Sequence, residues 1–303
     1  MILSDLSEAE VKRRLRAGEM VFTCGPFTVR VASPVQHIGE ALHLLYADYP
    51  LSDGFADFRL DLMTSGGVRR WLRPKVVFTA DGEQPFAPFP LDQAYPLFEW
   101  SLNWCIATVT HQCLIIHAAV VERDGRALIL PGSPGTGKST LAAALVNRGW
   151  RLFSDELTLI DVDTGRIVPL PRPISLKNAS IDTIRAFAPN AVFGRITHNT
   201  VKGTICHMKP ATDHVRRAYE TALTGWVVFP KYAAGASAKL APRSKHDTVL
   251  ELARNCFNYR VLGRIGFDLL CDALETSECF DFEYGKLDDA VAAFDRVRLK
   301  EAA

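Results

Sequence analysis

Residues 127–140 read ALILPGSPGTGKST, and this stretch determines what kind of fold the chain can form. Gly132, Gly137, Lys138 and Ser139 match the pattern G-x-x-x-x-G-K-[ST] of a phosphate-binding loop. The glycines allow the backbone to turn so that successive N–H groups point to one spot. Lys138 can reach the β- and γ-phosphates of a nucleotide, and the Ser139 hydroxyl can bind the accompanying Mg²⁺.

The segments on either side of this loop have the patterns of a strand and a helix. Residues 127–130 form a short apolar run after the turn Asp124-Gly125, and residues 141–148 are rich in strong helix formers. The order of strand, glycine-rich loop and helix is the one that nucleotide binding requires, because the helix N-terminus adds a partial positive charge. The predicted nucleotide-binding residues are Gly132, Ser133, Pro134, Gly135, Thr136, Gly137, Lys138, Ser139 and Thr140.

Composition narrows the classes of protein that remain. The chain has 303 residues, of which 48% are hydrophobic and 23% charged, and its net charge is +1. This balance gives no electrostatic reason to expect nucleic acid or an anionic membrane as a partner. No apolar run has the length of a membrane span, and the acidic N-terminus is not a signal peptide. Seven scattered cysteines without a C-x-x-C pair predict reduced thiols in a cytoplasmic protein.

The chain changes in character near residue 110. Before this point we predict helices over 7–16, 36–46 and 91–109, and strands over 20–22, 27–31, 56–62 and 75–79. After it we predict strands over 114–121, 127–130, 152–162, 166–170 and 225–229, and helices over 181–187, 245–257 and 287–297. We therefore expect an α/β protein with a smaller mixed α/β region over 1–110, suited to substrate or partner binding, and a nucleotide-binding domain over 111–303.

Two adjacent acids, Asp155 and Glu156, follow the predicted loop helix closely. They should return to the neighbourhood of the phosphates at the end of a strand. One can hold Mg²⁺ while the other orients and deprotonates an attacking hydroxyl. Asp161 ends a second apolar run, but residues 161–165 have the composition of a hairpin turn, which would place Asp161 away from the loop.

A histidine completes the pattern. His117 ends the apolar run 114–116, where a histidine is more often a hydrogen-bonded core residue, yet it lies one strand before the loop. Together with the loop and the sequence RGWRLFSDE at 148–156, it resembles the core of the HPr kinase/phosphorylase family, and most of all the bacterial HPr-kinase-related kinases.

This resemblance implies a P-loop kinase core of the HPr-kinase and phosphoenolpyruvate-carboxykinase type. It implies that Asp155 is the catalytic base toward a serine hydroxyl, that His117 supports this base, and that Ser139 and Glu156 bind Mg²⁺. It further implies a homo-oligomer. The chain carries Glu156 where the regulatory enzymes carry Asp, and no segment like Glu-Ile-Arg-Gly-Leu-Gly follows, so the resemblance does not extend to HPr as the substrate or to reverse phosphorolysis.

Three lysines at the mouths of β-runs could complete the site, because phosphoryl transfer needs cations around the γ-phosphate. These are Lys177, Lys202 and Lys231, and for each of them a solvated surface lysine is the competing interpretation.

We therefore predict an ATP- and Mg²⁺-dependent kinase that acts on a hydroxyl, most simply Ser or Thr of a protein or modified peptide, with Lys138, Asp155 and His117 as catalytic residues. A small-molecule kinase on the same core and a non-catalytic nucleotide-binding module are the alternatives.

Overall fold

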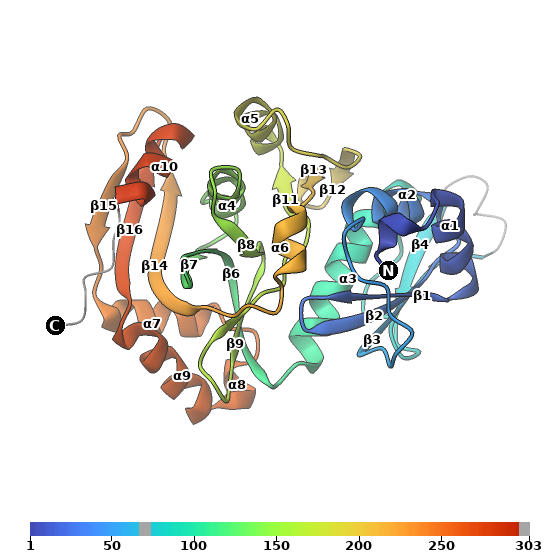
Figure 1. Cartoon of the computed structure of the whole chain (residues 1–303), viewed down its shortest axis with the longest axis horizontal. Helices are drawn as coiled ribbons and strands as arrows, with labels where there is room; N and C mark the ends of the chain where they lie inside the picture. Colours follow the sequence, from blue (N-terminus) through green and yellow to red (C-terminus); the bar gives the residue numbers. More distant parts are fainter. Residues whose placement is uncertain (67–73, 297–303) are drawn as a thin grey trace.

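The computed structural model of the protein describes residues 1–66 and 74–296, where helices and three β-sheets form two neighbouring regions (Figure 1). The residues up to the helix α3 form the smaller region, on the right of Figure 1. The remaining residues form the larger region, which contains the glycine-rich loop. The prediction of a mixed α/β protein is confirmed.

The smaller region is built on a five-stranded sheet in the order β1-β2-β3-β4-β5. Only β2 and β3 are parallel to each other. The strands are β1 (Met20–Cys24), β2 (Phe27–Ala32), β3 (Phe58–Thr64), β4 (Lys75–Thr79) and β5 (Phe89–Pro90). The α-helices are α1 (Glu8–Ala17), α2 (Gln36–Leu45) and α3 (Ala94–Val109), with short 3₁₀ turns η1 (Leu3–Asp5) and η3 (Leu91–Gln93).

Local sequence signals set the ends of the first helix and the first hairpin in this region. The Ser7 hydroxyl accepts a hydrogen bond from the Glu10 amide at 3.2 Å, which caps the first turn of α1. Gly18 ends the helix in the left-handed conformation, with φ of 67°. The two predicted strands on either side of Gly25 form a hairpin, because β1 pairs antiparallel with β2.

The larger region has an eight-stranded sheet in the order β10-β9-β6-β7-β14-β16-β15, with β8 also paired to β6. Its strands are β6 (Cys113–Arg123), β7 (Arg126–Pro131), β8 (Arg151–Ser154), β9 (Leu157–Asp161), β10 (Ile167–Val168), β14 (Leu223–Tyr232), β15 (Lys239–Pro242) and β16 (Glu278–Tyr284). The strands β7, β14 and β16 run parallel to one another. Their carboxyl ends therefore lie at one edge of the sheet, which is where ligands bind in α/β proteins.

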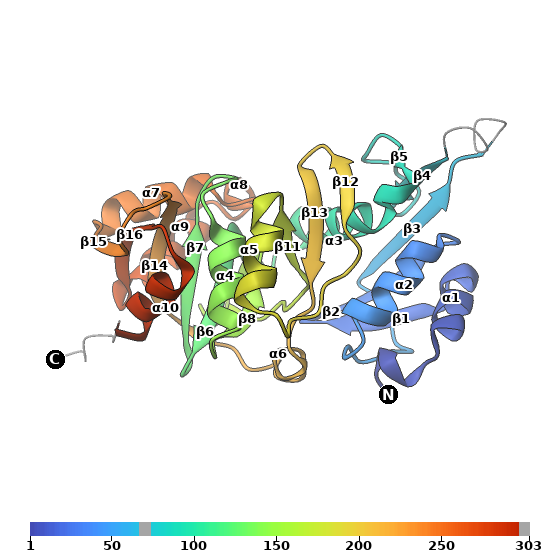
Figure 2. The same ribbon diagram turned by 90° about the horizontal axis from the view of Figure 1, so that it is seen from above.

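Helices cover both faces of this sheet (Figures 1 and 2). One face packs against α4 (Lys138–Val146) and α10 (Leu287–Arg296), and α5 (Ala179–Phe187) packs against α4 on the same side. The other face packs against α7 (Lys245–Arg254), α8 (Tyr259–Leu262) and α9 (Arg264–Glu275). A small sheet of β11 (Ile174–Lys177), β13 (Gly203–Met208) and β12 (Thr197–Thr200) lies between the large sheet and the smaller region, with α6 (Thr212–Arg216) below it in Figure 1.

Three predictions in the larger region need correction. The expected single strand over 152–162 is broken at Asp155 and Glu156 into β8 and β9, which both pair with β6. The helix expected over 245–257 ends at Arg254, because residues 255–257 leave it to form a bridge to β6. The predicted strand over 166–170 is shorter, Ile167–Val168, and residue 297 lies outside the described residues.

The apolar core continues across residue 110. Leu102 and Ile106 of α3 belong to the same buried cluster as Ile115 of β6 and Leu159 of β9. The two regions are therefore joined by packed side chains, and the predicted boundary at 110 stays a prediction. Among the described residues, no helix is both long and apolar enough to cross a lipid bilayer.

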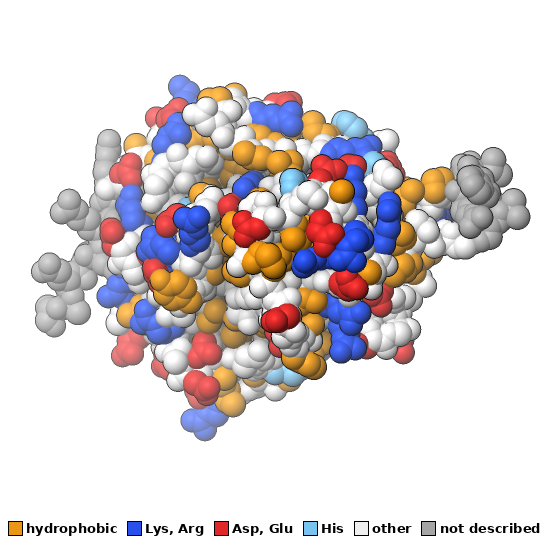
Figure 3. Space-filling view, turned by 45° about the vertical axis from the view of Figure 1, so that its right-hand side comes forward, with side chains coloured by type: hydrophobic (Ala, Val, Ile, Leu, Met, Phe, Trp, Pro, Cys, Tyr) orange, Lys and Arg blue, Asp and Glu red, His pale blue; other side chains and the backbone are white. Residues whose placement is uncertain are grey.

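Charged groups of both signs are interspersed on the molecular face in Figure 3, with hydrophobic side chains between them.

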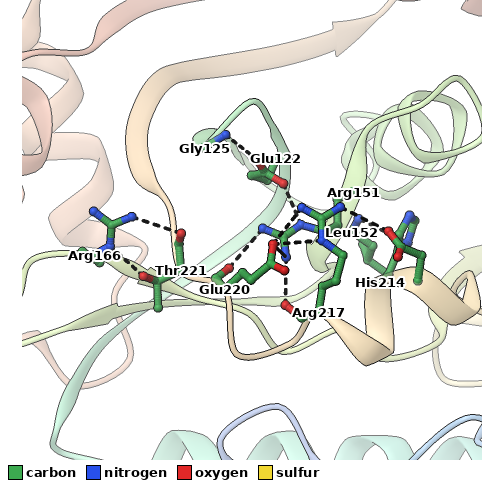
Figure 4. A network of polar contacts seen from close by, with 10 residues as sticks. Glu122, Gly125, Arg151, Leu152, Arg166, His214, Arg217, Glu220 and Thr221 are labelled. Carbon is green, nitrogen blue, oxygen red and sulfur yellow. Dashed lines mark hydrogen bonds and ion pairs between the residues drawn. The ribbon is translucent and has the colours of Figure 1, made fainter.

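A buried ion pair joins β8 to β6, where Arg151 Nε donates to Glu122 Oε2 at 2.6 Å (Figure 4). Arg151 also donates to the carbonyl oxygens of Arg217 and Glu220, at 2.8 and 3.0 Å. This network attaches the segment between α6 and β14 to the start of β8.

Candidate functional site

The glycine-rich loop connects β7 to α4, so the predicted order of strand, loop and helix is confirmed. Gly132, Gly135 and Gly137 all have positive φ, a conformation that residues with a side chain rarely adopt. A Cβ on Gly137 would come within 2.6 Å of Tyr284 Oη. The loop is held from the ends of the two parallel strands, because Tyr284 Oη donates to Gly137 O and the Tyr232 amide donates to Thr136 O, both at 3.2 Å.

Lys138 is the first residue of α4, and its side chain turns back over the loop. The ammonium group donates to the carbonyl oxygens of Gly132 and Ser133. Only 8% of the residue is exposed. Burial lowers the pKa of Lys138, and the negative charge of Asp155 acts in the opposite direction. The lysine charge therefore lies inside the loop and faces the acid pair.

The two acids occupy the short connection between β8 and β9, next to the start of α4. Asp155 is buried, and its Oδ2 accepts a hydrogen bond from the Ser175 amide at 2.9 Å. Its Oδ1 has no hydrogen-bond partner in the described residues. Glu156 is partly exposed, with Oε2 at 2.5 Å from Asn103 Nδ2 and Oε1 at 3.8 Å from Lys177 Nζ.

The environment shifts the pKa values of the two acids in opposite directions. Burial raises the pKa of Asp155 to about 6, and the neighbouring charge of Glu156 adds to the shift, while Lys177 and the nearby Ser139 hydroxyl oppose it. Burial also acts to raise the pKa of Glu156, but the positive charges of Lys202, Lys177 and Arg172 outweigh it and lower the pKa. Such a divergence is typical of pairs in which one group exchanges a proton and the other stays charged.

His117 lies at the same edge of the sheet, because it pairs with Leu157 directly after the two acids. Its ring packs against Phe257 with the ring centroids 5.8 Å apart. Burial lowers the pKa of His117, Lys138 adds to this effect, and Glu156 opposes it. Within the described chain no hydrogen bond joins the His117 ring to Asp155, so the predicted support of the base by His117 stays a prediction.

The three predicted lysines have different surroundings. Lys177, at the end of β11, approaches Glu156 as described above. Lys202, in the turn between β12 and β13, lies over the ring of Trp100 with Nζ 5.0 Å from the ring centroid. Lys231 is separate: its side chain is 74% exposed and lies 3.9 Å from Glu283. Lys177 and Lys202 are thus near enough to the acid pair to affect the pKa of Glu156, whereas Lys231 pairs with Glu283 instead.

One wall of the site comes from α3 and was not predicted. Glu99, Trp100 and Asn103 line the same small pocket as Asp155, Glu156 and Arg172. Glu99 and Asn103 are four residues apart on a mostly apolar helix, so they lie on one helix face. Polar residues at this spacing in an apolar helix are the sequence signal that could have identified this wall.

The site has oxygen groups for Mg²⁺ rather than a cage of metal ligands. Among residues 1–66 and 74–296, no group of three or more His, Cys, Asp and Glu side chains is arranged to hold a metal ion. Magnesium is commonly bound by one or two carboxylates together with substrate phosphates and water. Ser139, Asp155 and Glu156 therefore fit a metal that arrives with a nucleotide.

The chain is similar to one protein family over part of its length, and to several solved structures. A family model described as "SynChlorMet cassette protein ScmC" matches residues 98–186, which is less than half of the chain and includes α3 from Phe98 onward, the loop and both acids. That family is not described as an HPr kinase. No curated protein matches the chain.

Among solved structures, the HPr(Ser) kinase/phosphatase from Coxiella burnetii matches with 11% sequence identity and a TM-score of 0.24. The match covers 60% of this chain and 95% of that chain. Superposition at this level does not establish a common fold.

Proposed function

We propose that the protein is an ATP- and Mg²⁺-dependent phosphotransferase that transfers the γ-phosphoryl group to a hydroxyl, most simply that of Ser or Thr in a protein or peptide. The observation that carries the proposal is the meeting of the glycine-rich loop with an acid pair whose pKa values diverge. The resemblance of the sequence to HPr-kinase-related kinases supports the same reading.

In this proposal Asp155 is the base. A pKa of about 6 leaves Asp155 ionised at neutral pH yet able to accept a proton from a hydroxyl, which suits general base catalysis. Its unpaired Oδ1 is the atom available to take the proton. Lys138 and Lys177 would balance the charge of the transferring phosphoryl group.

Glu156 and Ser139 would hold Mg²⁺, which stabilises the charge that develops on the phosphates. The lowered pKa of Glu156 keeps its carboxylate charged, as a metal ligand requires. The proximity of Asp155 to Ser139 favours a second assignment, in which Asp155 binds the metal and Glu156 is the base. The two assignments predict different metal dependence for the same pair of variants.

The division of roles is tested by Ser139→Ala, Glu156→Gln and Asp155→Asn. If Ser139 and Glu156 hold the metal, their variants should raise the Mg²⁺ concentration for half-maximal transfer by about tenfold, the loss of about 1.4 kcal/mol of binding. Asp155→Asn should leave this concentration near the wild-type value. An increase in Asp155→Asn with none in Glu156→Gln would reverse the two roles.

The overall function is tested with γ-labelled ATP, a cell extract, and a Lys138→Ala variant as the control. Label on a protein band that is lost in Lys138→Ala supports the proposal. Label on a small molecule would favour the small-molecule kinase, and ATP binding without transfer would favour a regulatory module. Unchanged ATP affinity of folded Lys138→Ala by calorimetry would contradict the assignment of the loop.

A further inference from the structure

The wall formed by α3 contains a chain of polar contacts that begins in the core of the smaller region. Tyr46 Oη and Tyr95 Oη both donate to Glu99 Oε1, at 2.9 and 2.5 Å. Arg172 donates to Glu99 Oε2 at 2.5 Å and to the Glu99 carbonyl oxygen at 2.9 Å. Glu99 and Arg172 are 4% and 8% exposed, so this pair is fixed inside the protein.

The fixed guanidinium group determines how the Asn103 amide is oriented. Arg172 can only donate hydrogen bonds, so the atom that faces it at 2.6 Å must be the amide oxygen of Asn103. The amide nitrogen then faces Glu156 Oε2 at 2.5 Å, where a charged carboxylate can only accept. A donor-only group on one side and an acceptor-only group on the other leave a single orientation for the amide.

A third contact brings the smaller region to the site from another direction. Gln93, at the end of η3, donates through Nε2 to the Asn199 carbonyl oxygen at 3.0 Å. Asn199 lies in β12, beside the turn that carries Lys202. Figure 2 shows this hairpin next to α3. The start of α3 therefore holds the Lys202 hairpin, and its middle holds Glu156.

We propose that Asn103 is a positioning residue that holds the Glu156 carboxylate at the metal site, and that α3 of the smaller region is thereby a required part of this site. The inference rests on the proposed function. Asn103 acts through Glu156 and needs no contact with the nucleotide. Arg172 and Glu99 act on Glu156 indirectly, because they fix the orientation of the Asn103 amide.

The test uses Asn103→Leu, which has a similar volume and no polar atoms, and Asn103→Ser, which keeps a small polar side chain but is too short to reach Glu156. Calorimetry measures ATP binding by the full chain at a series of Mg²⁺ concentrations and without metal. Both variants should raise the Mg²⁺ concentration for half-maximal binding by about tenfold, since a hydrogen bond to a charged group is lost. Metal-free ATP affinity should stay unchanged, as should all values for Thr108→Ala on the same helix.

A second measurement separates positioning from a merely structural role. In a Glu156→Gln background, the Asn103 variants should add nothing to the Mg²⁺ requirement, because their effect passes through Glu156. An additive effect there, or wild-type Mg²⁺ dependence in Asn103→Ser, would overturn the inference. If Asn103→Leu does not fold, Asn103→Ser alone decides. Absence of Mg²⁺-dependent ATP binding in the wild type would instead overturn the proposed function, and the inference with it.

Discussion

Two buried arginine–glutamate pairs have the same chemistry, but their remaining hydrogen bonds go to different groups. The Arg151–Glu122 pair is 6% and 5% exposed, and its further hydrogen bonds go to backbone groups: two carbonyl oxygens and, through Glu122, the Gly125 amide (Figure 4). Arg151 also lies 3.4 Å from the partly exposed carboxylate of Glu220. The Arg172–Glu99 pair ends on Asn103, which continues to an acid of the site. The first network holds chain segments together, and the second also orients a charged group.

This difference teaches that burial and ion pairing by themselves do not mark a functional residue. The Arg151 network consists of Glu122, backbone groups and Glu220, none of which lines the small pocket, so we interpret it as structural. The Arg172 network leaves Nε of Arg172 without a partner among the described residues and ends at the small pocket with the acid pair. Variants in each network, and in the acids, can show whether stability and activity separate in this way.

The largest effect is expected for Asp155→Asn. The change keeps the shape of the side chain but removes the proton acceptor, so the rate of transfer should fall by about 10²–10⁴-fold while Mg·ATP still binds. Single-turnover transfer to a fixed acceptor measures this rate. Asp161→Asn is the control, because Asp161 accepts from the amide and hydroxyl of Thr164 in the predicted hairpin turn. A crippled Asp161→Asn with a normal Asp155→Asn would place the chemistry elsewhere.

Arg151→Met should reduce stability without altering the site. Removal of one partner leaves Glu122 charged and buried, which costs about 3–5 kcal/mol of the free energy of unfolding. Urea unfolding measures this loss, and calorimetry should give wild-type Mg·ATP affinity for the folded variant. Arg254→Met is the matched control, because Arg254 is 75% exposed and should contribute less than about 1 kcal/mol. Weaker Mg·ATP binding in folded Arg151→Met would contradict the contrast between the two networks.

Arg172→Met should change both the free energy of unfolding and the Mg²⁺ dependence of ATP binding. Glu99 would remain buried without its cation, so the loss of stability should match that of Arg151→Met, at about 3–5 kcal/mol. Asn103 would also lose the donor that orients its amide, so the Mg²⁺ requirement should rise. The same urea and calorimetric measurements apply. A stability loss with unchanged Mg²⁺ dependence would make the second network as purely structural as the first.

The smallest effect is the pH dependence that Asp155 confers on stability. Its pKa is about 6 in the folded protein and 3.8 in the reference state, so the folded state binds its proton more tightly. The favourable contribution is complete below pH 4 and is lost as the pH rises through 6. Wild type should therefore lose about 2–3 kcal/mol relative to Asp155→Asn between pH 4 and pH 7 in urea unfolding. Equal pH dependence of the two proteins would count against a raised pKa.

The sequence alone determined the parts of the protein that depend on local chemistry. The loop from Gly132 to Ser139 lies between a strand and a helix because an apolar run, glycines that allow positive φ, and strong helix formers follow one another directly in the sequence. The nearness of Asp155 and Glu156 to the loop followed from the short chain between them. The capped start of α1 and the turn at Asp161 were readable for the same reason.

Only the tertiary structure decided which distant residues complete the site. Asn103 reaches Glu156 across 53 positions of the sequence, and Arg172 reaches Glu99 across 73. The separation of Lys231 from the other lysines and the break between β8 and β9 also depend on strand pairing. The contacts of Asn103 and Glu99 arise from how α3 packs beside the acid pair. No local pattern in the sequence encodes the partner of a buried polar group.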